Sequence, residues 1–267
     1  MMHELTIEQM RLVQLEMMDS IHSYCKAENI RYSLAGGSLL GAVKYSGYVP
    51  FDDDIDIMMP RPDYERFINS YESVKDYVMD LSQSDSCREM FSKVCRRGTR
   101  LSDPLLGRTT FPIFIDVCPV DGVPSDCPEY LRILRRKLNL VPKICAYYKE
   151  VPGNKSIWFL KYVVKRILVG YPHNEKTLKQ SITDFLSEYR FEDCPKAGEM
   201  LVFRTEEDVY PIEIFTNYRE YEFEGRKYCG ICDYDTYLTS KYAWLGDYMN
   251  LPPLSQAMHN YKILSED

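Results

Sequence analysis

The stretch whose side chains point most clearly to chemistry is an acidic run, Asp52 to Asp56, in which four of five residues are aspartates. On a β-strand, side chains two positions apart point to the same face, so Asp54 and Asp56 are predicted to project together. Two carboxylates this close repel each other unless a cation lies between them. Hard oxygen ligands of this kind suit Mg²⁺ or Mn²⁺, so the pair predicts a metal site.

A glycine pair precedes this acidic run. Residues 31–35 are short and end in an apolar pair, which predicts a strand running into Gly36 and Gly37. Glycine lets the backbone turn sharply and approach a ligand closely. Ser38 is expected to begin a helix through about Lys44, and free N–H groups at such a turn suit a phosphate. A phosphate cradle followed by metal-binding carboxylates indicates phosphoryl or nucleotidyl transfer.

Two other interpretations of the acidic run stay open. It could be a solvated turn, although the apolar residues that follow it argue against a wet loop. It could also be a calcium loop, because alternate aspartates match the first EF-hand ligands. That loop needs glycine at its sixth position and normally glutamate at its twelfth, where this chain has Ile57 and Asp63.

A third carboxylate lies further along the chain. Residues 111–120 alternate as a strand does, with apolar side chains on one face and Asp116 on the other. A carboxylate there is costly to bury unless it is paired or metal-bound, so Asp116 is a candidate catalytic residue and metal ligand. The alternative is a turn-capping aspartate, a role that fits Asp121 better. Lys93, on a predicted strand at 90–96, could touch a donor phosphate or be a solvated surface residue.

These motifs closely resemble those of the LicD family. The resemblance is strongest from Ala35 to Lys44 and from Gly47 to Ile57, and it continues at Ile113 to Pro124 and more moderately over 220–260. That family contains phosphocholine transferases of bacterial surface polysaccharides, and fukutin and the fukutin-related protein look like distant members. All are similar to the nucleotidyltransferase superfamily. The chain departs from the family pattern where Ala243 to Leu245 separate a tyrosine from the next glycine.

The resemblance implies a metal-dependent transferase. It would move phosphocholine, or a related phospho-alcohol, from CDP-choline or another CDP-linked donor to a sugar hydroxyl, with release of CMP. The acceptor would be a glycan or lipid-linked sugar of lipopolysaccharide, teichoic acid or capsule. Asp54, Asp56 and Asp116 would hold Mg²⁺, and Asp116 could also take the acceptor proton. The alternatives are a nucleotidyltransferase that uses a nucleoside triphosphate, and an inactive binding protein.

Choline recognition would need aromatic faces or carboxylates, because a quaternary ammonium donates no hydrogen bond. Candidate choline or acceptor contacts gather near the C-terminus: Tyr242, Trp244, Asp247 and Tyr248. The alternative is that these tyrosines only pack, with their hydroxyls at the surface.

The rest of the chain predicts an α/β (or α+β) fold with a small nucleotidyltransferase-like mixed sheet flanked by helices. Of 267 residues, 45% are hydrophobic and 27% charged, which is ordinary for a globular protein. The predicted parts are a catalytic core at 1–125, a helical lobe at 126–200, and a segment at 201–267 that packs back on the core. Thr6 and Gln9 form a predicted capping box, Asp63 is expected to cap a helix to about Tyr71, and residues 215–232 predict a hairpin.

Charge and cysteine usage bear on location and partners. The nine cysteines are scattered, which fits a reducing compartment, and the N-terminus lacks a signal-peptide layout, so we expect a cytoplasmic enzyme. Residues 130–169 hold ten Lys/Arg and one acid in a chain of net charge −7. This favours a specific anionic partner over nucleic acid. The basic amphipathic stretch 157–169 could lie peripherally on the anionic inner face of a membrane, or pack on the core.

Overall fold

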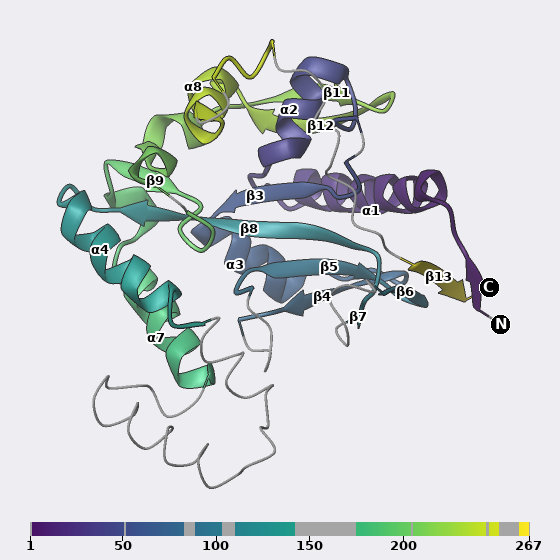
Figure 1. The fold of residues 1–267 in the computed structure, drawn as a ribbon, viewed down its shortest axis with the longest axis horizontal. Coiled ribbons are helices and arrows are strands. Elements are labelled where there is room, and N and C mark those ends of the chain that lie inside the picture. Colours follow the sequence, from purple (N-terminus) through teal and green to yellow (C-terminus); the bar gives the residue numbers. More distant parts are fainter. Residues whose placement is uncertain are drawn as a thin grey trace, which may run out of the picture.

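The central sheet is built around one long strand, β8 (Phe114–Val123), which is buried along its whole length. The computed structural model describes residues 2–50, 52–82, 89–102, 110–141, 175–203, 205–243, 246–250 and 262–266. In it, β8 pairs in parallel with β3 (Asp56–Pro60) and antiparallel with β5 (Ser92–Arg96) and β9 (Lys196–Gly198) (Figure 1). Helices flank this mixed sheet, so the predicted α/β fold class is confirmed.

Shorter strands complete the sheet, and two smaller sheets accompany it. Strand β2 (Ser33–Leu34) pairs with β3, β4 (Asp76–Asp80) with β5, and β10 (Tyr210–Pro211) with β9. The second sheet brings the two ends of the described chain together (Figure 1) and consists of β1 (Met2–Glu4), β13 (Lys262–Glu266), β6 (Thr99–Ser102) and β7 (Thr110–Phe111). The predicted hairpin is confirmed as β11 (Tyr218–Phe223) and β12 (Arg226–Ile231).

Helix α1 (Ile7–Ala27) begins at the predicted capping box. The Thr6 hydroxyl accepts from the Gln9 N–H, and the Gln9 side chain accepts from the Thr6 N–H. Helix α3 (Arg61–Ser70) begins earlier than predicted, and the expectation that Asp63 caps it was wrong. The Asp63 carboxylate is instead drawn to Arg31, whose Nε lies 2.6 Å away.

Two further helices form a layer with its own apolar core. Helices α4 (Cys127–Leu138) and α7 (Glu175–Ser187) pack together (Figure 1) through leucine side chains of both and Ile182 of α7. Between these two helices in the sequence, the basic amphipathic stretch 157–169 lies outside the described residues. Among the residues that are described, none of the helices is long and apolar enough to cross a bilayer.

The remaining helices gather beside the start of β3. They are α2 (Gly36–Tyr45) and α8 (Tyr234–Lys241), which lie near the β11–β12 hairpin (Figure 1). Short 3₁₀ helices precede α8 in the chain: η1 (Phe191–Asp193), η2 (Glu206–Asp208) and η3 (Ile212–Phe215). Apolar side chains of β9–β12 and α8 join the main core formed by α1, α3 and the central sheet. The proposed division into a catalytic core at 1–125, a helical lobe at 126–200 and a C-terminal segment at 201–267 stays a prediction.

Candidate active site

Two of the predicted carboxylates face each other across adjacent strands. Asp56 is the first residue of β3, and in the parallel register with β8 its partner is Asp116. Paired residues on neighbouring strands share a face of the sheet, with their backbones about 4.8 Å apart. Asp116 is 8% exposed, and its N–H donates to the Ile55 carbonyl, which fixes the two strands at this point. The expectation that Asp54 shares a strand face with Asp56 was wrong, because β3 begins at Asp56 and Asp54 lies in the turn before it. A role for these carboxylates in the reaction stays a prediction.

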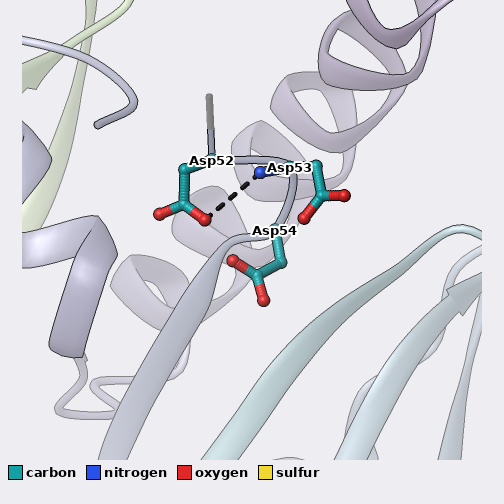
Figure 2. A group of neighbouring side chains, drawn as sticks. All are labelled: Asp52, Asp53 and Asp54. Atoms are coloured by element: carbon teal, nitrogen blue, oxygen red, sulfur yellow. Dashed lines mark hydrogen bonds between the residues drawn. The ribbon is translucent and has the colours of Figure 1, made fainter. Parts of the chain in front are cut away.

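The acidic turn before β3 adds further carboxylates. One oxygen from each of Asp52, Asp53 and Asp54 lies within 4.8 Å of the others, and an Asp52 oxygen accepts from the Asp53 N–H (Figure 2). Helix α1 holds the turn from behind: Arg11 donates to the Asp52 carbonyl, and Gln14 Nε2 donates to the Asp53 carbonyl over 3.0 Å. Asp52 is thus a candidate ligand that sequence reasoning left aside, although its spacing from Asp54 was a usable signal.

The glycine pair approaches this turn directly. Helix α2 begins at Gly36, two residues before the predicted start at Ser38. Gly36 has a positive φ of 47°, which favours glycine, and a Cβ on Gly37 would lie 2.8 Å from Asp52 Oδ2. The Ser38 hydroxyl accepts from the Asp56 N–H over 2.9 Å and so ties α2 to β3. The three predicted phosphate-binding residues are therefore brought together with the carboxylates.

The buried carboxylates of Asp52, Asp56 and Asp116 are unfavourable in their charged form. Burial, then the charge of Asp54, raises the pKa of Asp52 to about 8. Burial, then the charges of Asp54 and Asp116, raises the pKa of Asp56 well above its ordinary value. Burial also raises the pKa of Asp116 to about 7, despite the nearby Lys93 ammonium. A bound cation would relieve this repulsion, and an all-oxygen donor set fits Mg²⁺ or Mn²⁺. Metal binding itself stays a prediction.

Lys93 lies beneath this cluster, on β5. Its Nζ is 2.5 Å from Asp116 Oδ1 and 3.0 Å from Glu89 Oε2, and its side chain is 2% exposed. Burial alone would lower the pKa of Lys93, but the two carboxylates outweigh burial and raise it. The ammonium also lies 3.9 Å from the centre of the Phe114 ring. In this structure Lys93 therefore positions Asp116, and the predicted contact with a donor phosphate stays a prediction.

Helix α8 brings a polar network that sequence reasoning missed. The Glu199 carboxylate is buried and accepts from Tyr237 OH over 2.7 Å and from Lys241 Nζ over 2.5 Å. The Tyr237 hydroxyl in turn accepts from the Gly36 N–H over 3.1 Å. Burial would lower the pKa of Lys241, but Glu199 raises it well above its ordinary value, so the ammonium stays charged. The one usable signal was the i, i+4 spacing of Tyr237 and Lys241 on a helix.

The candidate choline contacts are placed differently from one another. Tyr242 is half-buried, and its hydroxyl would lie 3.9 Å from a Cβ on Gly36. Tyr248 is 4% exposed and donates to Asp235. Asp247 is exposed and accepts from the Met249 N–H and from Asn250 in a turn. Trp244 lies outside the described residues. The structure thus brings Tyr242 to the glycine turn.

Asp121, the alternative turn-capping aspartate, does not cap a turn. It lies within β8, is 1% exposed, and its Oδ1 accepts from Arg61 Nε over 2.6 Å. The interpretation as a cap was wrong because β8 continues past Asp116 to Val123 and carries Asp121 into the interior.

A glycine turn beside carboxylates on two paired strands is the arrangement of a phosphoryl- or nucleotidyl-transfer site. Comparison with known proteins agrees with this class. The family model described as "LicD/FKTN/FKRP, nucleotidyltransferase domain" matches residues 29–98, which include the glycine turn and the acidic run.

Individual relatives extend the match. The lipopolysaccharide cholinephosphotransferase LicD of Haemophilus influenzae is 30% identical over 260 residues, which are 94% of this chain and 94% of that protein. An uncharacterized protein of Rickettsia typhi is 38% identical over 60 residues, 22% of this chain and 19% of that protein. One of Rickettsia prowazekii is 45% identical over 42 residues, 16% of each chain. The chain belongs to the LicD family.

Proposed function

We propose that this LicD-type phosphotransferase moves phosphocholine, or a related phospho-alcohol, from a CDP-linked donor to a sugar hydroxyl of lipopolysaccharide. The Haemophilus relative is named a lipopolysaccharide cholinephosphotransferase, which supports the transferred group and the acceptor. The observation that carries the proposal is the pairing of Asp56 with Asp116 beside the glycine turn, because it places acidic groups next to the turn that the sequence assigns to phosphate binding.

In this proposal Asp54, Asp56 and Asp116 hold Mg²⁺ or Mn²⁺, with Asp52 as a further ligand. When bound, the metal would neutralise charge that develops on the phosphate and leaving group. Gly37 and Ser38 would bind the donor phosphate at the glycine turn. The acceptor hydroxyl oxygen forms the new bond to phosphorus, the bond from phosphorus to the CMP oxygen breaks, and Asp116 takes the hydroxyl proton. The Lys93 ammonium keeps the Asp116 carboxylate in place for that step.

One incubation separates the alternatives. The protein is mixed with MgCl₂, unsubstituted lipopolysaccharide and, in separate reactions, CDP-choline, CDP-ribitol, CDP-glycerol and each nucleoside triphosphate. We expect CMP and choline-bearing lipopolysaccharide from CDP-choline. Pyrophosphate from a triphosphate would assign the chain to the nucleotidyltransferase alternative, and no product from any donor would favour a binding protein.

Location belongs to this proposal as well. A cytoplasmic enzyme that docks peripherally on an anionic membrane surface through residues 157–169 would meet a lipid-linked acceptor. Those residues lie outside the described ones, so this part stays a prediction from sequence. Flotation with vesicles that contain anionic lipid at low salt tests it, because electrostatic attraction is strongest there.

A further inference from the structure

The N–H group that begins helix α2 is already engaged. The Gly36 N–H donates to the Tyr237 hydroxyl, which donates in turn to the buried Glu199 carboxylate. A phosphate at the glycine turn therefore does not find this backbone donor free. It needs another positive group to bind it firmly, since phosphate recognition depends on charged hydrogen bonds.

Lys241 is placed to supply that group. Its Cε would lie 3.6 Å from a Cβ on Gly36, and Asp56 Oδ2 would lie 3.7 Å from the same point. The lysine side chain and the metal-site carboxylate thus flank one spot over the glycine turn. The Lys241 side chain is 24% exposed, whereas that of Lys93 is 2% exposed and enclosed by aromatic rings. Lys241 is therefore the more accessible of these two cations.

We propose that Lys241 binds a phosphate of the donor at the glycine turn, and that Glu199 and Tyr237 are positioning residues for it. The inference rests on the proposed function in one respect, a donor that bears a phosphate. Glu199 holds the Lys241 ammonium through one carboxylate oxygen, Oε2, which also accepts from the Tyr237 hydroxyl. Tyr237 couples that anchor to Gly36, so the cation and the glycine turn keep a constant separation.

Binding calorimetry without turnover tests this. The probes are CDP and inorganic pyrophosphate, each with MgCl₂, and the proteins are the wild type, Lys241→Met and Lys241→Arg. Loss of one charged hydrogen bond should weaken the affinity of Lys241→Met for both probes by about 10- to 100-fold, and Lys241→Arg should recover part of it. The matched control is Lys26→Met, which removes a lysine paired with Glu220 at the surface and should bind both probes normally.

A double variant separates binding from folding. Lys241→Met alone leaves Glu199 buried without its cation, so its Tm should fall. Glu199→Gln/Lys241→Met should recover Tm while the probe affinity stays weak. Recovery of affinity together with Tm would overturn the inference, because Lys241 would then serve only to neutralise Glu199. If the wild type binds pyrophosphate but not CDP, and Lys241→Met weakens the affinity for pyrophosphate, the role of Lys241 is supported and the proposal of a CDP-linked donor is contradicted. Wild type that binds neither probe contradicts both.

Discussion

A Cβ on Gly37 would lie 2.8 Å from Oδ2 of Asp52, so the first turn of α2 and the acidic turn approach as closely as glycine allows. We expect Gly37→Ala to push the Asp52 carboxylate aside and to lower kcat/KM by about a hundredfold, the usual cost of a displacement near 1 Å in an active site. Its Tm should hold, because alanine is favoured over glycine in a helix by about 1 kcal/mol.

The control for this prediction is Gly41→Ala in the same helix. A Cβ there meets backbone atoms of Gly47 and Val49, which cannot swing away as a side chain can. The Tm of Gly41→Ala should therefore fall, whereas Gly37→Ala should lose activity at an unchanged Tm. Full activity in Gly37→Ala would show that the Asp52 carboxylate plays no part in the reaction.

Asp56→Asn tests the metal site through stability as well as activity. Removing one of several mutually repelling carboxyls should raise the Tm measured in EDTA, abolish the further rise on adding MgCl₂, and lower transfer by at least about a hundredfold. Differential scanning fluorimetry with and without MgCl₂ measures the first two effects.

The matched control is Asp121→Asn, on the same sheet but paired with Arg61. Because it leaves a buried guanidinium without its partner, it should lower the free energy of unfolding by about 3–5 kcal/mol, and with it the Tm, while the MgCl₂ response persists. If Asp56→Asn keeps the rise in Tm on adding MgCl₂, the metal is bound by residues other than Asp56.

How far the sequence predicts this site depends on the range of the interaction. Strand alternation was sufficient to put Asp116 on the face of its strand opposite the apolar side chains, and the capping box at Thr6 was local enough to be predicted directly. Alternation alone did not give the pairing of Asp116 with Asp56, which depends on the register between β3 and β8. The start of α2 was misplaced because the Ser38 hydroxyl accepts from Asp56 on β3 instead of capping its own helix.

The remaining features depend on tertiary contacts that no local pattern encodes. Glu199 reaches the glycine turn through residues about forty positions further along the chain, Tyr237 and Lys241. Lys93 looked like a surface or phosphate-binding residue, and its burial against Asp116 follows from the antiparallel register of β5 with β8. A periodic pattern gives the face of a strand, but it does not give the neighbouring strand or the register.

Acid should destabilise the fold through His22, which lies on α1 away from the acidic cluster. Burial, and then Lys26, lowers the pKa of His22 below its ordinary 6.5. The unfolded chain therefore takes up a proton as pH falls through about 6.5, while the folded chain takes it up at lower pH, so stability is lost in that window. His22→Gln should reduce the fall in Tm between about pH 7.5 and pH 5.5.

The comparison variant is His3→Gln, whose side chain is exposed. It removes an imidazole from β1 and so tests whether a change in the pH dependence is specific to His22. A wild-type slope in His22→Gln would mean that the imidazole titrates equally in the folded and unfolded chain, and that its 2.6 Å contact with Tyr32 OH tolerates either form.

Choline recognition can be tested at Tyr242, the tyrosine of the C-terminal set that the structure brings to the glycine turn. Tyr237 and Tyr248 are buried, and their hydroxyls bond to Glu199 and Asp235. If Tyr242 offers its ring to the trimethylammonium group, Tyr242→Leu should raise KM for CDP-choline by about 2- to 30-fold, the range of a cation–π contact. KM for CDP-glycerol, whose alcohol is uncharged, should change little. Tyr248→Phe is the control, because it removes a hydroxyl bonded to Asp235 and should leave the ratio of the two KM values unchanged.

Trp244→Ala extends the test to a residue predicted from sequence. Equal losses for both donors in Tyr242→Leu would show that the ring supports Gly36 and the phosphate instead of the choline, and discrimination would then have to be sought at Trp244.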